Sequence, residues 1–181
     1  MIRVISGIYK GKRLKKVPSP LVRPMPDKLK TALFNILQEE VRDAAFLDGF
    51  AGTGSIGIEA LSRGAGNTVF IEEYFPAVKV IKINLARCGA EVKARIIPRE
   101  FNRAVIQLAK EKEKFDLIFL DPPYELLEER NPLKVIKKRE ILAPGGKIIL
   151  RHYFKTKFEA KYFILFRQVT IGDDTLSFFS E

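Results

Sequence analysis

The chain has 181 residues, of which 46% are hydrophobic, so it is long enough for one domain with a substantial core. Its single cysteine, Cys88, excludes an intramolecular disulfide and suits a reducing, cytoplasmic location. The longest apolar runs are only as long as strands, which argues against a membrane-spanning helix and predicts a soluble protein that does not bind membranes.

The formal net charge of +10 is concentrated at the N-terminus. Residues 1–30 contain nine lysines and arginines and one acid, Asp27, and thus carry a charge of +8. Such a basic arm predicts a polyanionic partner, although a solvated, solubilising surface explains the charge equally well. The residues expected to contact the partner are Arg3, Lys10, Lys12, Arg13, Lys15, Lys16 and Arg23.

Residues 1–42 are predicted to form an extension that binds this partner, and residues 43–181 to form one compact catalytic unit. Residues 2–17 are typical of a small β-hairpin that turns near Gly11. An amphipathic helix is expected to follow, from about Asp27 to Val41.

Beyond residue 44, predicted strands alternate with predicted helices. The expected strands are Ala45–Asp48, Thr68–Glu72, Lys93–Ile97, Phe115–Leu120 and, after a turn at residues 143–146, Lys147–Leu150. The expected helices are Ser55–Arg63, Phe75–Cys88, Phe101–Lys112 and Pro132–Ile141. Repeated βα units predict an α/β fold with a doubly wound parallel sheet and helices on both faces. A C-terminal antiparallel hairpin is expected to follow, from Tyr162–Val169 and Thr175–Phe179.

A glycine-rich loop lies between the first strand and the first helix of these units. Gly52, Gly54 and Gly57 match the pattern G-x-G-x-x-G, and Glu72 ends the next strand. In this context the pattern predicts a site for a ligand with a ribose, whose hydroxyl groups Glu72 would bind. NAD and S-adenosylmethionine both contain an adenosine ribose, so these residues do not separate them.

Two further acids favour S-adenosylmethionine over NAD. Asp48 ends the first strand, where its charge would repel a pyrophosphate and attract a cationic amino-acid group. Glu100 follows the third strand at the same edge of the sheet. Together with Glu72, these acids match the ribose, the adenine amine and the ammonium group of S-adenosylmethionine.

The sequence Asp121-Pro122-Pro123-Tyr124 directly follows the apolar fourth strand. An exocyclic amine of a base is a poor nucleophile, because its lone pair is delocalised into the ring. The Asp121 carboxylate and the Pro122 carbonyl are suited to accept the two N–H groups of such an amine, and Tyr124 to stack on the base. The motif resembles the signature of amino-group methyltransferases that act on nucleic-acid bases or on glutamine.

Further blocks resemble the bacterial 16S rRNA guanine-N2 methyltransferases, the small-subunit methyltransferase D type. They are Arg3–Gly7, Lys10–Leu14, Arg23-Pro24, Leu33–Leu37, Phe50–Gly54 and Glu59–Ala65. The resemblance implies a Rossmann-like class I methyltransferase fold, a monomer, and direct methyl transfer without a metal to one guanine of a partly assembled small subunit. S-adenosylhomocysteine would be the product, and the implied cofactor-binding residues are Asp48, Phe50, Ala51, Gly52, Gly54, Glu72, Glu73, Glu100 and Phe101.

Three residues depart from the pattern of this family. Met25 stands where threonine is usual, and Glu100 stands where aspartate or asparagine is usual. Arg151 stands where a glutamate often ends the fifth strand, and the sequence offers no explanation for it.

Several alternatives remain open at this point. The same Asp-Pro-Pro-Tyr chemistry serves adenine-N6 and glutamine-N5 methyltransferases, whereas an NAD-dependent oxidoreductase or a non-catalytic RNA-binding module would leave the motif unused. Structural roles are expected for His152, the only histidine, and for Cys88. The aromatic residues within Tyr162–Phe166 are expected to pack the C-terminal hairpin onto the sheet.

Overall fold

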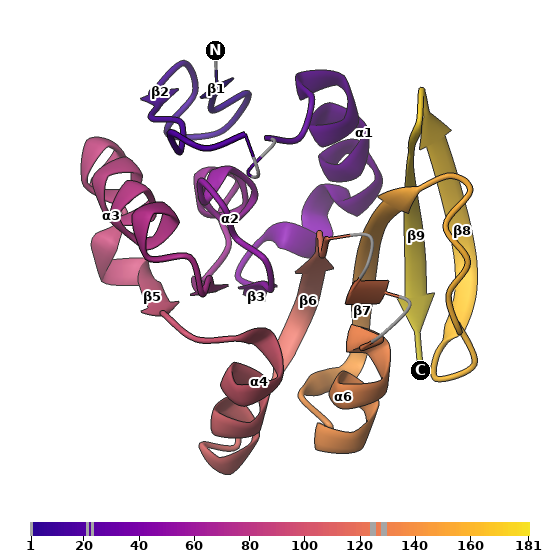
Figure 1. Cartoon of the computed structure of the whole chain (residues 1–181). Coiled ribbons are helices and arrows are strands. Elements are labelled where there is room, and N and C mark those ends of the chain that lie inside the picture. Colours follow the sequence, from indigo (N-terminus) through magenta and orange to yellow (C-terminus); the bar gives the residue numbers. More distant parts are fainter. Residues whose placement is uncertain (1, 21, 23, 124–125, 128–129) are drawn as a thin grey trace.

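A seven-stranded mixed sheet with helices on both faces forms the centre of the structure, a computed structural model that describes residues 2–20, 22, 24–123, 126–127 and 130–181 (Figure 1). The first five strands in spatial order are parallel to one another, and β9 and β8 continue the sheet in antiparallel fashion. The spatial order is β5 (Ala94–Ile97), β4 (Asn67–Ile71), β3 (Ala45–Asp48), β6 (Phe115–Leu120), β7 (Leu142–Tyr153), β9 (Asp174–Ser180) and β8 (Ile164–Ile171). The predicted doubly wound sheet with a C-terminal hairpin is confirmed.

The helices cover the two faces of the sheet in separate groups (Figure 1). One face carries α1 (Asp27–Leu37), α2 (Ser55–Ser62) and α3 (Phe75–Cys88), and the other carries α4 (Phe101–Lys110) and α6 (Pro132–Arg139). Successive side chains of a strand point to opposite faces, so a strand between two helical layers is apolar throughout. In β6, Leu117 and Phe119 pack toward the first group of helices, and Ile118 and Leu120 toward the second.

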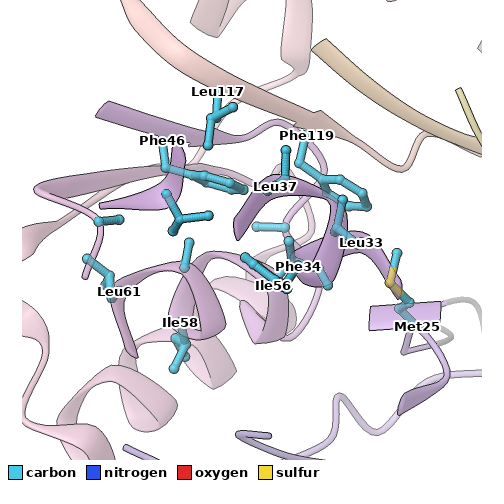
Figure 2. Close-up of a cluster of buried hydrophobic side chains, with 14 of the residues drawn as sticks. Met25, Leu33, Phe34, Leu37, Phe46, Ile56, Ile58, Leu61, Leu117 and Phe119 are labelled. Carbon is cyan, nitrogen blue, oxygen red and sulfur yellow. The ribbon is translucent and has the colours of Figure 1, made fainter. Parts of the chain in front are cut away.

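The N-terminal extension adds a small hairpin above α2. Strands β1 (Ile2–Arg3) and β2 (Arg13–Leu14) pair in antiparallel fashion, as predicted from residues 2–17. Ile2 and Leu14 belong to the same hydrophobic cluster as Met25 and the buried residues of α1, α2 and the sheet. Figure 2 shows part of this cluster, including Met25. The extension therefore shares a core with the rest of the chain, and the division at residue 42 remains a prediction.

Several predicted boundaries were wrong, among them the following three. Helix α1 ends at Leu37 because Gln38 has a φ of 43°, and a short 3₁₀ helix, η1 (Gln38–Val41), follows. Residues 143–146 lie within β7, where the register with β6 shifts between Leu142 and Lys147. A second 3₁₀ helix, η2 (Glu91–Lys93), takes up the residue expected to begin the third strand.

The C-terminal aromatic residues pack less completely than expected. Phe163 is buried, but Phe166 in the edge strand β8 is 47% exposed, and its neighbour Leu165 is 40% exposed. Only part of this segment therefore packs on the sheet. Within the described ranges, no helix has both the length and the apolar character needed to cross a membrane.

Candidate functional site

The glycine loop and the Asp-Pro-Pro motif meet at the point where the order of the parallel strands reverses. From β3 the chain proceeds to β4 and β5 on one side, and later to β6 and β7 on the other side. In such sheets, ligands bind beyond the carboxyl ends of the strands at this switch point. Asp48 is the last residue of β3, and Asp121 directly follows the neighbouring strand β6.

The glycine loop turns tightly over the end of β3. Gly52 and Gly54 have φ values of 54° and 76°, in the left-handed region that favours glycine, and Gly54 caps the start of α2. A Cβ atom on Gly57 would lie 2.3 Å from the ring of Phe70, so helix α2 approaches β4 closely only with glycine at this position. The loop is thereby held against the sheet.

Asp48 is a buried acid without a cationic partner among the described side chains. It is 1% exposed, and its Oδ2 accepts a hydrogen bond from the N–H of Gly57, at 3.0 Å. Burial, opposed by this hydrogen bond and reinforced by the charges of Asp121 and Glu72, raises the pKa of Asp48 to about 7. A cation bound nearby would relieve this concentration of negative charge.

Glu72 holds the glycine loop from the end of β4. Its two carboxylate oxygens accept hydrogen bonds from the N–H groups of Gly52, at 2.7 Å, and Tyr74, at 2.8 Å. Burial raises the pKa of Glu72 above its usual value, and these two hydrogen bonds only partly offset this rise. Glu72 is therefore placed beside the loop, where the sequence predicted the ribose acceptor.

The remaining predicted cofactor residues occupy the same edge of the sheet. The Glu100 carboxylate accepts a hydrogen bond from the N–H of Arg103, at 3.1 Å, and so caps α4. Phe101 is buried, and its ring stacks on the half-buried ring of Phe50 with a centroid separation of 4.7 Å. Ala51 is buried as well, and Glu73 is exposed. Their contacts with a cofactor remain predictions.

The Asp-Pro-Pro turn presents a carboxylate and a carbonyl at the end of β6. The Pro123 carbonyl accepts a hydrogen bond from the N–H of Leu126, at 3.0 Å. No backbone N–H group of the described residues donates to the Pro122 carbonyl. Of the two proline carbonyls, that of Pro122 is therefore the one open to a substrate. Tyr124, predicted to stack on the base, lies outside the described residues.

A row of charged side chains crosses four neighbouring strands on the face that α1, α2 and α3 cover. Residues two positions apart in a strand point to the same face. In the order β3, β6, β7 and β9, the row consists of Asp48, Asp121, Arg151 and Asp174. Each of these residues lies two positions from a buried core residue of the same face, namely Phe46, Phe119, Ile149 and Leu176, respectively. The row contains three acids and one base, so its net charge is negative.

Arg151 joins two of these acids. Its Nη1 donates to Oδ2 of Asp121 at 2.8 Å, and its Nε donates to Oδ1 of Asp174 at 3.0 Å. Sequence reasoning noted Arg151 only as a departure and did not consider Asp174. The signal that indicates this contact in the sequence is the alternation of apolar Ile149 and charged Arg151 along β7, the strand next to the one that ends before Asp121. The other departure, Met25, is 6% exposed and packs in the core (Figure 2).

The basic arm is largely exposed, although two of its charged side chains form ion pairs. Lys10, Lys12, Arg13, Lys15 and Lys16 are exposed, and the predicted contact Arg23 lies outside the described residues. Arg3 is exposed but forms an ion pair with Asp27, at 3.6 Å. Lys30, which contributed to the charge of +8, is 1% exposed and pairs with Glu59, so its charge is not available to a partner.

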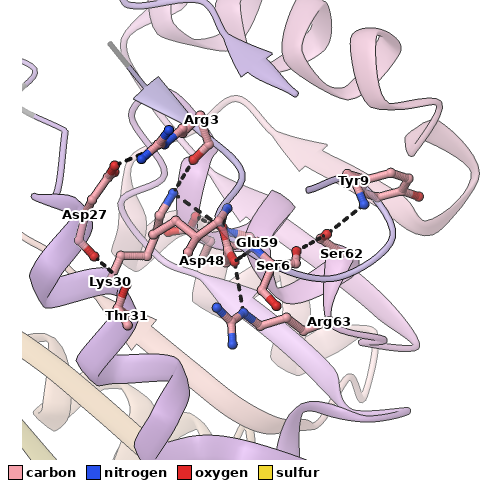
Figure 3. A network of polar contacts seen from close by, with 12 residues as sticks. Arg3, Ser6, Tyr9, Asp27, Lys30, Thr31, Asp48, Glu59, Ser62 and Arg63 are labelled. Carbon is pink, nitrogen blue, oxygen red and sulfur yellow. Dashed lines mark hydrogen bonds and ion pairs between the residues drawn. The ribbon is translucent and has the colours of Figure 1, made fainter. Parts of the chain in front are cut away.

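Helix α2 connects the arm to the glycine loop. Its N-cap residue, Gly54, belongs to the loop, and residues near its C-terminal end contact the arm (Figure 3). Glu59 accepts hydrogen bonds from the N–H groups of Ile5 and Ser6, at 2.8 and 3.0 Å. The hydroxyl of Ser62 accepts from the N–H of Tyr9, at 2.9 Å. The arm is thus held in a fixed position against α2.

Asn84 of α3 makes a second connection between the arm and the loop. Its side-chain amide donates to the carbonyls of Lys15, at 3.0 Å, and Thr53, at 2.9 Å. Its Oδ1 accepts from the N–H of Lys15, at 2.6 Å. Since Thr53 belongs to the glycine loop, one buried side chain bridges the two regions.

His152 and Cys88 have the structural roles that the sequence predicted. The ring nitrogens of His152 contact the carbonyl of Tyr153, at 2.9 Å, and the hydroxyl of Ser177, at 2.8 Å. Burial lowers the pKa of His152, so the neutral ring is favoured. Cys88 is a buried member of the hydrophobic core.

Comparisons with known proteins agree with this geometry. The family model described as "Conserved hypothetical protein 95" matches residues 2–180. Ribosomal RNA small subunit methyltransferase D of Haemophilus influenzae is 33% identical over 152 residues, which cover 81% of this chain and 76% of the relative. A hypothetical protein of Thermus thermophilus has a solved structure with a TM-score of 0.85 and 28% identity, covering 98% of both chains.

A more distant structure identifies the fold. An S-adenosylmethionine-dependent methyltransferase from Agrobacterium tumefaciens superposes with a TM-score of 0.60 at 22% identity, covering 68% of this chain and 44% of that one. The switch-point sheet and the glycine loop described above match this Rossmann-like class I methyltransferase fold. By sequence and by fold, the chain belongs to the ribosomal RNA small subunit methyltransferase D family.

Proposed function

We propose that the chain transfers a methyl group from S-adenosylmethionine to the exocyclic N2 of a guanine in 16S rRNA. The observation that carries this proposal is the placement of Asp48 and Asp121 at the ends of adjacent strands, on the two sides of the switch point. One acid then faces the cofactor side and the other begins the Asp-Pro-Pro turn. The names of the relatives support rRNA as the substrate class.

The acids of the site fit S-adenosylmethionine better than NAD. Asp48, Asp121 and Glu72 lie around the glycine loop, and burial, reinforced by the charges of Asp121 and Glu72, raises the pKa of Asp48 to about 7. A pyrophosphate placed there would meet repulsion, whereas an ammonium and a sulfonium would be attracted. Because Asp48 is fully buried, it acts on the ligand through its charge across the loop, while Glu72 lies at the position for the ribose.

The Asp-Pro-Pro turn orients the amine that is methylated. When bound, S-adenosylmethionine supplies an electrophilic methyl group on a sulfonium. The Asp121 carboxylate and the Pro122 carbonyl accept the two N–H groups of the amine, which directs the nitrogen lone pair away from the ring and toward the methyl carbon. Transfer of the methyl group to nitrogen would leave S-adenosylhomocysteine as the other product, and Asp121 or water would accept the surplus proton on nitrogen. Catalysis is then mainly alignment of the reactants.

The basic arm favours RNA over the other amine substrates. The exposed residues Lys10, Lys12 and Arg13 lie around the turn of the N-terminal hairpin, and α2 and Asn84 connect this hairpin to the cofactor loop. Glutamine methylation would leave this surface without a role. Adenine-N6 methylation of DNA generally relies on a separate recognition domain, whereas the described residues form the sheet, its covering helices and the small N-terminal hairpin.

Nucleoside analysis tests the proposal directly. The purified protein is incubated with S-adenosylmethionine and either 16S rRNA or partly assembled small subunits, and digested nucleosides are identified by mass spectrometry. We expect N2-methylguanosine, a much lower yield with Asp121→Asn, and an unchanged yield with Asp116→Asn, which alters a carboxylate at the other end of β6. N6-methyladenosine, or methylation of protein alone, would overturn the proposed specificity.

A further inference from the structure

Arg151 is fixed in one orientation between two carboxylates on neighbouring strands. Strand β7, which carries it, lies between β6 and β9 in the sheet. Leu120 pairs with Leu150, so the residues that follow them, Asp121 and Arg151, lie side by side. Two different nitrogens of the guanidinium contact the two acids, Nη1 at Asp121 and Nε at Asp174, and the Arg151 side chain is only 10% exposed. A planar guanidinium held at both positions has little freedom to rotate.

The surroundings of Asp121 would favour its neutral form if Arg151 were absent. The charged groups that face it are Asp48 from β3, Arg151 from β7 and Asp174 from β9, so Arg151 is the only cation among the described groups around it. Burial raises the pKa of Asp121 above its usual value, and Arg151 limits this rise, while the charge of Asp174 adds to it. A neutral carboxylic acid would present an O–H donor to the donor groups of an amine, which is the wrong polarity.

The contact with Arg151 also distinguishes the two oxygens of Asp121. Oδ2 accepts the hydrogen bond from Nη1, whereas Oδ1 forms no hydrogen bond within the described part of the chain. Oδ1 is thus left for an incoming N–H group. The geometry separates an oxygen that is held by the protein from an oxygen that is presented to a substrate.

We propose that Arg151 is a positioning residue for methyl transfer: it holds Asp121 as a carboxylate and directs Oδ1 toward the target amine. Asp174 completes the arrangement by fixing the far side of the guanidinium. This inference rests on the proposed role of Asp121. Through Asp174 of β9, which contacts Arg151, the C-terminal hairpin thus influences the position of Asp121.

The first test measures the ionisation of Asp121 without any activity. The protein is labelled with ¹³C at aspartate side chains, the Asp121 signal is assigned from its loss in Asp121→Asn, and the carboxyl signals are titrated with pH. Replacing Arg151 with Met should raise the pKa of Asp121 by about 1–3 units, since an opposite charge is removed at contact distance. Arg151→Lys should restore most of the wild-type value, because it keeps the positive charge. Arg167→Met, which removes an exposed arginine of β8, should leave the titration unchanged.

The second test follows kcat against pH at saturating cofactor and RNA. The acid limb of Arg151→Met should move to higher pH, so that at pH values below the limb kcat falls about tenfold for every pH unit that the limb moves. The affinity for S-adenosylhomocysteine, measured by calorimetry, should stay within a factor of two, which a disrupted fold would not allow. If the Met variant does not fold, Arg151→Gln offers a polar replacement with the same expected changes.

The two proposals fail in different ways. If neither the Asp121 titration nor the acid limb moves in the Arg151 variants, Arg151 has no positioning role, whatever the substrate is. If the wild-type protein methylates no RNA, the proposed function fails, and the NMR titration still measures the coupling between Arg151 and Asp121.

Discussion

The Nζ atom of Lys30 lies 3.4 Å from Oε2 of Glu59, and neither side chain is more than 1% exposed (Figure 3). Lys30 belongs to α1 and Glu59 to α2, so this ion pair joins the N-terminal extension to the helix that begins at the glycine loop. Glu59 also accepts hydrogen bonds from Arg63 Nε, at 2.9 Å, and from the arm backbone. Burial lowers the pKa of Lys30, and Glu59 opposes that effect.

The contacts of the buried ion pair predict that replacing Glu59 lowers the free energy of unfolding more than replacing Lys30. Glu59→Ala leaves the Lys30 ammonium buried without its carboxylate and should lower the free energy of unfolding by about 3–5 kcal/mol. Lys30→Met leaves Glu59 paired with Arg63 and with two backbone N–H groups, so it should cost only about 1–2 kcal/mol. Denaturant unfolding measures both. Glu39→Ala, which breaks the exposed pair of Glu39 and Arg42, is the control and should change stability by less than about 0.5 kcal/mol. Equal losses for Glu59→Ala and Lys30→Met would contradict the assignment of Glu59 as the centre of the network.

Glu72 should contribute to cofactor binding in two ways. Its carboxylate is placed to accept ribose hydroxyls, and it holds the N–H of Gly52 in the glycine loop. Glu72→Ala should therefore weaken S-adenosylhomocysteine binding by about 1–3 kcal/mol in calorimetric titration. Glu73→Ala, which removes the exposed neighbouring carboxylate, is the matched control and should have a smaller effect. Wild-type affinity in the Glu72 variant would rule out the ribose assignment.

Asp48 should make cofactor binding depend on pH. Its pKa is about 7 in the folded protein and about 4 in an unfolded chain, so the free folded protein holds an extra proton between these values. Folding stability should therefore decrease as the pH rises from about 4 to 7, because over this range the unfolded chain releases the proton that the folded protein still holds. A cationic ligand favours the carboxylate, so binding of S-adenosylmethionine below pH 7 should release a proton and strengthen as the pH approaches 7.

Calorimetry in two buffers with different ionisation enthalpies, at pH 6 and at pH 8, measures this proton release. It should be present at pH 6 and small at pH 8. Asp48→Asn cannot ionise, so it should show weaker binding without the proton release. Proton release of the same size in that variant would assign the effect to another group.

Much of the fold was predictable because its signals are local. The apolar run Phe115–Leu120 indicated a strand buried on both faces, and the spacing of Gly52 and Gly54 after Asp48 indicated a ligand loop. The end of α1 at Leu37 was not predictable from periodicity, because the apolar pattern continues through the 3₁₀ helix to the buried Val41. The positive φ of Gln38 depends on the tertiary structure and not on the local sequence.

The charged contacts were not predictable because they depend on which strands and helices become neighbours. Glu59 lies in an eight-residue helix and resembles a surface residue in the sequence, yet α2 is covered by the extension and Glu59 is completely buried. Arg151 contacts Asp121 and Asp174 only because β7 lies between β6 and β9. The acids at the strand ends were evident in the sequence, whereas the side chains that contact them were not.

The basic arm should act as an RNA clamp, and its exposed residues predict how. Lys10, Lys12 and Arg13 surround the hairpin turn, free of the ion pairs that occupy Arg3 and Lys30 within the described structure. Phosphate contacts release counterions, so log affinity should fall with log salt at a slope of about −0.7 to −0.9 per contact. Replacing the three residues with alanine should weaken binding to rRNA fragments and flatten the slope by about two to three.

A second triple variant separates this effect from a general loss of charge. Lys110, Lys138 and Arg139 are exposed at the ends of α4 and α6, next to the amino ends of the strands and away from the site. Replacing them with alanine removes the same net charge from the opposite face of the sheet, and the slope should then change little. Both variants should bind S-adenosylhomocysteine with wild-type affinity, because neither alters the glycine loop or its acids. Coincident salt titrations of the two triple variants would show that the arm contributes only its share of the overall charge and makes no local phosphate contacts.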